Sequence, residues 1–80
     1  MSNKDVDAIR RSIRSDQLRK LYDHAYGDGW LPSVTGSGHI RLRAPKPHGR
    51  YSVTFSASSD GSHRTVQNVR AYFRRGGLKV

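Results

Sequence analysis

Two short stretches of this chain alternate apolar and polar residues, and this alternation constrains the fold more than any other feature. In "HIRLR" (39–43) Ile40 and Leu42 alternate with basic residues, and in "YSVTFS" (51–56) aromatic residues and valine alternate with hydroxyl residues. Successive side chains of an extended chain point to opposite faces, so both stretches predict strands of a sheet with one apolar face. The opposite, polar face is expected to carry His39, Arg41, Arg43, Ser52, Thr54 and Ser56.

A third strand is predicted at "WLPSVT" (30–35). Pro32 has no N–H to give to a ladder, so this strand belongs at a sheet edge or a bulge. Gly36, Ser37 and Gly38 form a plausible hairpin turn into 39–43. The segment "APKPHG" (44–49), with two prolines and a glycine, reads as a loop between the second and third strands.

Apolar residues at helical spacing flank these strands. One helix is expected to start at Ser15 or Asp16 and to end at "GDG" (27–29), because glycine usually follows a helix C-terminus. A second is expected after the polar residues 58–62 and to stop at Gly76–Gly77. The apolar stripes are Leu18, Leu21, Tyr22 and Ala25 in the first helix, and Val66, Val69 and Phe73 in the second.

Residues 1–14 contain Val6, Ile9 and Ile13 and form either a short helix or a basic arm, while 15–80 form the main domain. The sheet has one apolar face, and helices with apolar stripes can cover it. The predicted fold is an α+β, two-layer α-β-β-β-α domain. Its three-stranded antiparallel sheet has both main helices on one face, with a possible extra N-terminal helix.

The charge of the chain narrows its possible partners. The 80 residues include 15 lysines and arginines against 6 acids, giving a net charge of +9, and they include no cysteine. A basic surplus of this size favours nucleic acid, ahead of an acidic protein or an anionic membrane. The sequence has no apolar run of membrane-spanning length and no signal peptide, which predicts a cytoplasmic protein.

Three stretches together resemble the HicA family of toxin ribonucleases. They are "GW" (29–30), "TGSGHIRL" (35–42) and "RTVQNVRAYFRRGG" (64–77), and the resemblance covers about residues 16 to 78. It implies a double-stranded-RNA-binding-like α-β-β-β-α fold, in agreement with the order derived from periodicity. The chain departs from the family in having Gly38 before a single histidine, where many members carry paired histidines.

The resemblance also implies an activity and a partner. Family members cleave messenger RNA without a metal or other cofactor, the histidine of the motif (here His39) is catalytic, and an acidic HicB-like antitoxin neutralises the toxin. Imidazole suits this chemistry because it can accept or donate a proton near neutral pH. The candidate RNA-binding residues are Ser37, Gly38, Arg41, Arg43, Arg70 and Arg74.

Other interpretations stay open at the level of sequence. His39 can be an ordinary polar-face residue, the glycines of the turn can serve the hairpin alone, and the basic face of the last helix can meet either RNA or an acidic antitoxin. The chain can then be a non-catalytic RNA-binding module or a small basic phage or bacterial protein-interaction factor. His24, His48 and His63 match no zinc spacing. Trp30 and Tyr72 are expected to pack in the core rather than to stack on bases.

Overall fold

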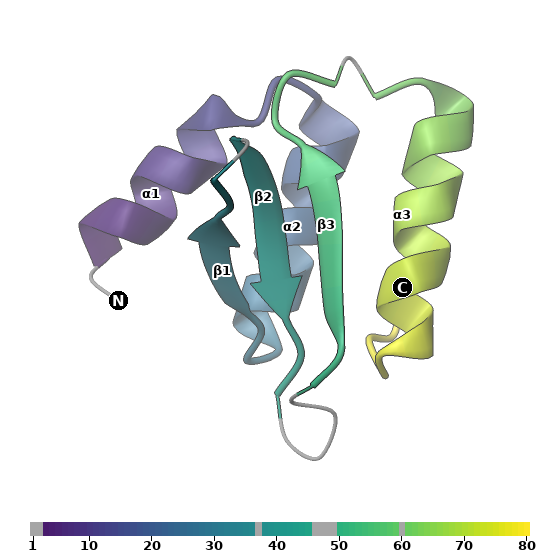
Figure 1. Ribbon diagram of the computed structural model, residues 1–80. Coiled ribbons are helices and arrows are strands. Elements are labelled where there is room, and N and C mark those ends of the chain that lie inside the picture. Colours follow the sequence, from purple (N-terminus) through teal and green to yellow (C-terminus); the bar gives the residue numbers. More distant parts are fainter. Residues whose placement is uncertain (1–2, 37, 46–49, 60) are drawn as a thin grey trace.

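The secondary structure follows the predicted order, with the additional N-terminal helix present (Figure 1). The computed structural model describes residues 3–36, 38–45, 50–59 and 61–80. No helix in these ranges is long and apolar enough to cross a membrane. The elements are α1 (Asn3–Ser12), α2 (Asp16–Gly27), β1 (Leu31–Val34), β2 (His39–Arg43), β3 (Ser52–Ser56) and α3 (His63–Arg75).

The strands form one antiparallel sheet in the order β1-β2-β3. Across β2 and β3, Ile40 pairs with Phe55 and Leu42 with Val53, so the apolar residues of both strands share one face. All four are buried, at 5 % exposure or less. Pro32 lies on β1 and pairs with Leu42 of β2. β1 is an edge strand, as predicted from the missing N–H of Pro32.

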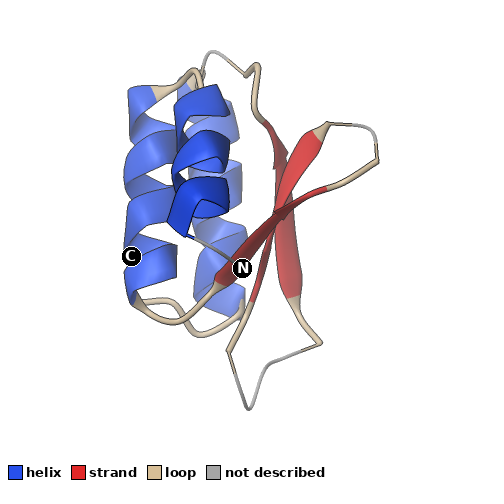
Figure 2. Cartoon of the chain, turned by 90° about the vertical axis from the view of Figure 1, so that its left-hand side faces the viewer, coloured by secondary structure: helices blue, strands red, loops and turns tan. Residues whose placement is uncertain are grey.

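All three helices cover the apolar face of the sheet and leave the other face open (Figure 2). The chain is therefore the predicted two-layer α+β domain, with three helices in the helical layer. The first of them, α1, contributes Val6 and Ile9 to the same buried cluster as α2, α3 and the sheet, and Ile13 follows in the link to α2. Of the two interpretations of the N-terminal segment, the helical one is confirmed.

Serine side chains define where the two longer helices begin. The hydroxyl of Ser15 accepts a hydrogen bond from the backbone N–H of Leu18, and that of Ser62 accepts one from Thr65. Each cap satisfies a backbone donor that has no partner within its helix. Gly76 ends α3, as the glycine pair predicts.

The two aromatic residues expected in the core have different environments. Trp30 is 1 % exposed and packs edge-on against Phe73, with ring centroids 5.1 Å apart. Tyr72 is 45 % exposed, so the prediction of core packing was wrong for this residue. The inward stripe of α3 is already formed by Val66, Val69 and Phe73. Tyr72, one residue before Phe73, is turned by about 100° around the helix axis and away from the sheet.

Candidate nucleic-acid interface

The open face of the sheet carries a row of basic side chains on its central strand. His39, Arg41 and Arg43 are all exposed on β2, separated by the buried Ile40 and Leu42. The rise of an extended chain places successive members of this row about 7 Å apart. Mostly hydroxyl residues flank the row. From β3, Ser56, Thr54 and Ser52 pair with His39, Arg41 and Arg43. From β1, Ser33 pairs with Arg41, and the exposed Leu31 pairs with Arg43.

A tight turn positions His39 as the first residue of β2. The N–H of Gly38 donates to the carbonyl of Thr35 at 3.0 Å, and the N–H of Thr35 donates to the carbonyl of His39 at 2.8 Å. The His39 N–H in turn donates to the Thr35 hydroxyl at 3.2 Å. Gly38 has φ +82°, a left-handed conformation that favours glycine. The backbone conformation of the turn therefore explains why a glycine occupies position 38. Ser37, the other RNA-binding candidate in this turn, lies outside the described residues.

The acidic side chains that the structure describes lie on α1 and α2 (Asp7, Asp16 and Asp23) and at the C-cap of α2 (Asp28). Asp23 on α2 receives two hydrogen bonds from Arg10 of α1, at 2.7 and 3.0 Å. Asp16 receives one from Arg19 at 2.8 Å. Because Arg10 donates these hydrogen bonds to Asp23, the pKa of its guanidinium is raised above the ordinary value. Because these carboxylates offset arginines of the helices, positive charge predominates on the open face, which is suited to an anionic ligand.

His39 is the outward-facing side chain of the described sheet whose chemistry allows proton transfer near neutral pH. Among the outward-facing residues that the structure describes on β1, β2 and β3, His39 is the only histidine, and none is an aspartate. Its neighbours Arg41 and Arg43 can stabilise negative charge that develops on a phosphate, while the imidazole accepts or donates a proton. The geometry therefore suits chemistry on a phosphodiester better than a multi-residue hydrolytic triad.

The five predicted RNA-binding residues that the structure describes do not form one surface. Gly38, Arg41 and Arg43 accompany His39 on the sheet and its turn. Arg70 and Arg74 lie on α3, in the opposite layer (Figure 2). The Arg74 Nε donates to the main-chain oxygen of Val80 at 2.5 Å. A single ligand on the open face would therefore not be expected to contact both groups.

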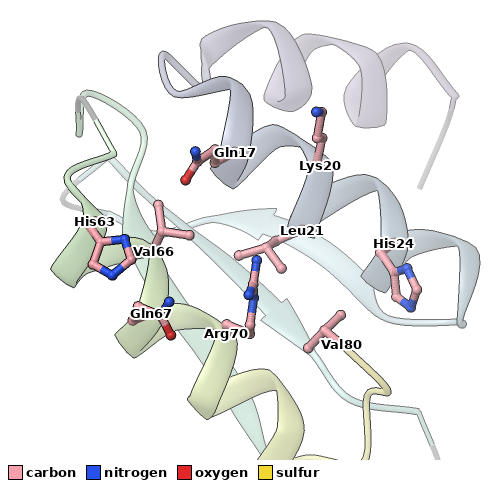
Figure 3. Close-up of a pocket in the computed structure, with 9 residues that line it drawn as sticks. All are labelled: Gln17, Lys20, Leu21, His24, His63, Val66, Gln67, Arg70 and Val80. Carbon is pink, nitrogen blue, oxygen red and sulfur yellow. The ribbon is translucent and has the colours of Figure 1, made fainter.

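Arg70 instead belongs to a groove of about 690 Å³ between α2 and α3 (Figure 3). Two of the remaining histidines, His24 and His63, also line it, whereas His48 lies outside the described residues. No group of three or more metal-binding side chains occurs in the described parts of the chain. Sequence reasoning missed this α2–α3 groove, which is lined by Gln17, Lys20, Leu21, His24, His63, Val66, Gln67, Arg70 and Val80.

Comparisons with protein-family models, with curated proteins and with solved structures found no match to this chain. The open face of the sheet and the residues of the motif are therefore the basis for assigning a function.

Proposed function

We propose that this protein binds RNA on the open face of its sheet and cleaves it without a metal ion, with His39 as general acid–base. The observation that carries the proposal is the exposed row His39–Arg41–Arg43 on the central strand. The resemblance to HicA toxins supports the same role for His39. The family's pairing of toxin with antitoxin further suggests that the protein is the toxin half of such a pair.

Cleavage by this face is an internal transesterification of the RNA backbone. His39 accepts the proton of a ribose 2′-hydroxyl, and the 2′-oxygen forms a bond to the adjacent phosphorus. The bond from phosphorus to the 5′-oxygen breaks, and a water molecule protonates that oxygen. The hydroxide that remains takes the proton from His39, so the imidazole is regenerated and the products are a 2′,3′-cyclic phosphate and a 5′-hydroxyl. Arg41, next but one along the strand, stabilises the charge of the pentavalent phosphorane. One imidazole fills one of the two proton-transfer roles, so we expect slow turnover.

The character of the face favours contacts to the RNA backbone over contacts to bases. None of its described, outward-facing residues is a tryptophan, tyrosine or phenylalanine on which a base could stack. Arginines and hydroxyl groups are typical contacts to phosphate and ribose. We therefore expect weak sequence preference from the sheet itself.

A second function, an RNA-binding module without cleavage, has one specific observation in its favour. The described outward-facing residues of the sheet offer His39 and no second acid–base group. The arginine row remains suited to binding in either case, and the two functions differ only in whether His39 transfers a proton.

The partner that follows from the resemblance is an acidic HicB-like antitoxin. A protein of opposite charge that covers the His39 row would exclude RNA and stop cleavage. The concentration of positive charge on the open face supports such an interaction through charge complementarity.

The experiment that tests cleavage compares wild type with His39→Ala on a labelled RNA in excess EDTA. His39 is exposed, so the substitution removes the imidazole without opening the core, and the variant should fold normally. Loss of acid–base catalysis should lower the cleavage rate by about 10² to 10⁴, with RNA binding nearly unchanged. His48→Ala, which removes another imidazole from the chain, should cleave like wild type. Equal cleavage by wild type and His39→Ala would contradict the assignment, and binding without cleavage by wild type would favour the non-catalytic module.

A further inference from the structure

The α2–α3 groove combines an apolar floor with cationic and amide-bearing walls. Leu21 and Val66 are 6 % and 3 % exposed and form apolar floor on either side. Each helix contributes four lining residues at the same spacing (i, i+3, i+4, i+7), which marks one continuous stripe per helix. Figure 3 shows the two stripes on either side of the gap, with Leu21 and Arg70 pointing into it and Lys20 pointing away from α3. They are Gln17, Lys20, Leu21 and His24 from α2, and His63, Val66, Gln67 and Arg70 from α3.

Arg70 has a hydrogen-bond donor that the described part of the chain does not use. Its Nε is buried and has no partner there, although the residue as a whole is partly exposed. A buried donor without a partner is unfavourable, and buried donors are therefore usually paired with an acceptor. A carboxylate can meet a guanidinium through two parallel hydrogen bonds, and the terminal nitrogens of the partly exposed Arg70 can supply them. The position of Arg70 in the groove wall makes it the natural anchor for an anionic group.

The charged side chains that the structure describes in the lining of the groove have one sign. Lys20 and Arg70 are cationic, and none of the described residues that line the groove is acidic. The carboxylates of α2 that the structure describes engage arginines elsewhere: Asp16 contacts Arg19, and Asp23 contacts Arg10 of α1. A second copy of this chain, with its own net charge of +9, is therefore a poor occupant.

The combination of an apolar floor and cationic walls in the groove favours one class of anionic ligand over another. An RNA backbone presents phosphate and ribose, which offer nothing large and apolar to pack on Leu21 and Val66. An amphipathic acidic segment of a protein presents both leucine-like side chains and carboxylates. Grooves with an apolar floor are typical docking sites for amphipathic helices.

We propose that the α2–α3 groove binds an acidic amphipathic segment of a partner protein. Its apolar side chains pack on Leu21 and Val66, and its carboxylates pair with Arg70 and Lys20. The groove lies in the helical layer, so a bound segment leaves the open sheet face free (Figure 2). This docking site is independent of the ribonuclease proposal and holds whether or not the protein cleaves RNA.

A designed peptide tests the proposal directly. The probe is a peptide of about 12 residues, roughly 18 Å long as a helix, with leucines at i, i+3, i+4 and i+7 and glutamates elsewhere. Titration into ¹⁵N-labelled wild-type protein at about 0.15 M salt, where long-range attraction is screened, should shift amides of α2 and α3 around the groove. A peptide with glutamine in place of glutamate should bind about 10-fold or more weakly, because charge-assisted hydrogen bonds are lost. A scrambled peptide of the same composition should also bind more weakly.

Matched variants locate the contact. Arg70→Gln and Lys20→Gln should each weaken binding of the leucine–glutamate peptide by about 3- to 10-fold. Arg64→Gln, which makes the same charge change on α3 outside the groove, should alter it by less than about twofold. Lys20 is exposed, so its variant tests the site even if Arg70→Gln perturbs folding.

The proposal would be overturned by no binding of the peptide, by equal binding of the scrambled or glutamine peptide, by an equal loss in Arg64→Gln, or by peptide shifts centred on β2 and β3. A single-stranded RNA oligonucleotide that shifts the groove amides would overturn it too, because the groove would then be a nucleic-acid site.

Discussion

Gly61, just before the serine cap of α3, approaches Ser15, the cap of α2, so closely that a side chain does not fit. A Cβ at Gly61 would lie 1.9 Å from the Ser15 Oγ, and the residue has φ +73°. Ser15 is itself 5 % exposed and is held by its hydrogen bond to Leu18. The two helix starts are thus packed against each other through a glycine and a buried hydroxyl.

Gly61→Ala should therefore lower the free energy of unfolding by about 2–3 kcal/mol, from left-handed strain and from overpacking against Ser15. Gly27→Ala is the matched control: Gly27 ends α2, and a Cβ there meets nothing within 4 Å. That variant should be neutral or up to about 1 kcal/mol more stable. Denaturant unfolding measures both, and equal stability of Gly61→Ala and wild type would contradict the packing described.

Tyr22 connects α2 to α1 and makes the stability depend on alkaline pH. Its hydroxyl donates to the carbonyl of Val6 at 2.9 Å, and the residue is 1 % exposed. Burial, with a smaller effect of Asp23, raises the pKa of Tyr22 from 10.0 to about 12. Below pH 10 the phenol is protonated in both states. As the pH rises towards 12 the unfolded chain ionises first, so the stability that Tyr22 contributes is lost.

Tyr22→Phe should consequently be less stable than wild type at pH 8, by about 0.5–1.5 kcal/mol for the lost hydrogen bond. The difference between the two proteins should shrink as the pH rises from 10 towards 12. Denaturant unfolding across that range measures the difference. A constant gap would show that the phenol of Tyr22 ionises at its ordinary pKa.

At the scale of elements, α1 is part of the core rather than an appendage. Ile9→Ala should lower the free energy of unfolding by about 2–4 kcal/mol, because Ile9 is 7 % exposed and its removal leaves a cavity. Arg11→Ala, on the exposed side of the same helix, should change it by less than about 0.5 kcal/mol. Similar stability of the two variants would indicate that α1 does not pack on the sheet.

The sequence predicts the strands and the two longer helices well because each has a clean local signal. The alternation at 39–43 matches β2 residue for residue, and a serine and a glycine bound α3 close to where they were expected. For α1, the place of the helix depends on the tertiary contacts of Val6 and Ile9, and these contacts cannot be read from a local sequence pattern. Tyr72 was misassigned because its neighbour Phe73 already takes the inward position.

The candidate site was predicted only in part, for a similar reason. Strand alternation is enough to place His39, Arg41 and Arg43 on one face. The predicted fold already places α3 in the layer opposite this face, but Arg70 and Arg74 were included among the RNA-binding candidates because of their charge, which does not show what they contact. The groove could have been found from the repeated i, i+3, i+4, i+7 spacing of Gln17–His24 and His63–Arg70, but which helix faces another is a property of the folded chain.

At the scale of the whole molecule, the basic residues divide between two layers, and this division limits how many phosphates the open face can neutralise. The row of His39, Arg41 and Arg43 can contact two to three phosphates. For single-stranded RNA this predicts that the logarithm of the binding constant falls with the logarithm of the salt concentration with a slope of about −1.5 to −2. Arg41→Gln should reduce that slope by about 0.7, and Arg64→Gln should leave it unchanged. Fluorescence anisotropy at several salt concentrations gives the slope, and a value beyond about −4 would mean that the α3 arginines also bind RNA.

Binding of RNA to the open face is tested most directly by an amide shift map of ¹⁵N-labelled His39→Ala, which should bind RNA without cutting it. Upon addition of a short single-stranded RNA, the largest shifts should fall on β2 and β3, at Arg41, Arg43 and Thr54. The amides of α2 and α3 around Lys20 and Arg70 should remain nearly unchanged. The largest shifts in α2 and α3, with β2 unaffected, would contradict an RNA site on the open face of the sheet.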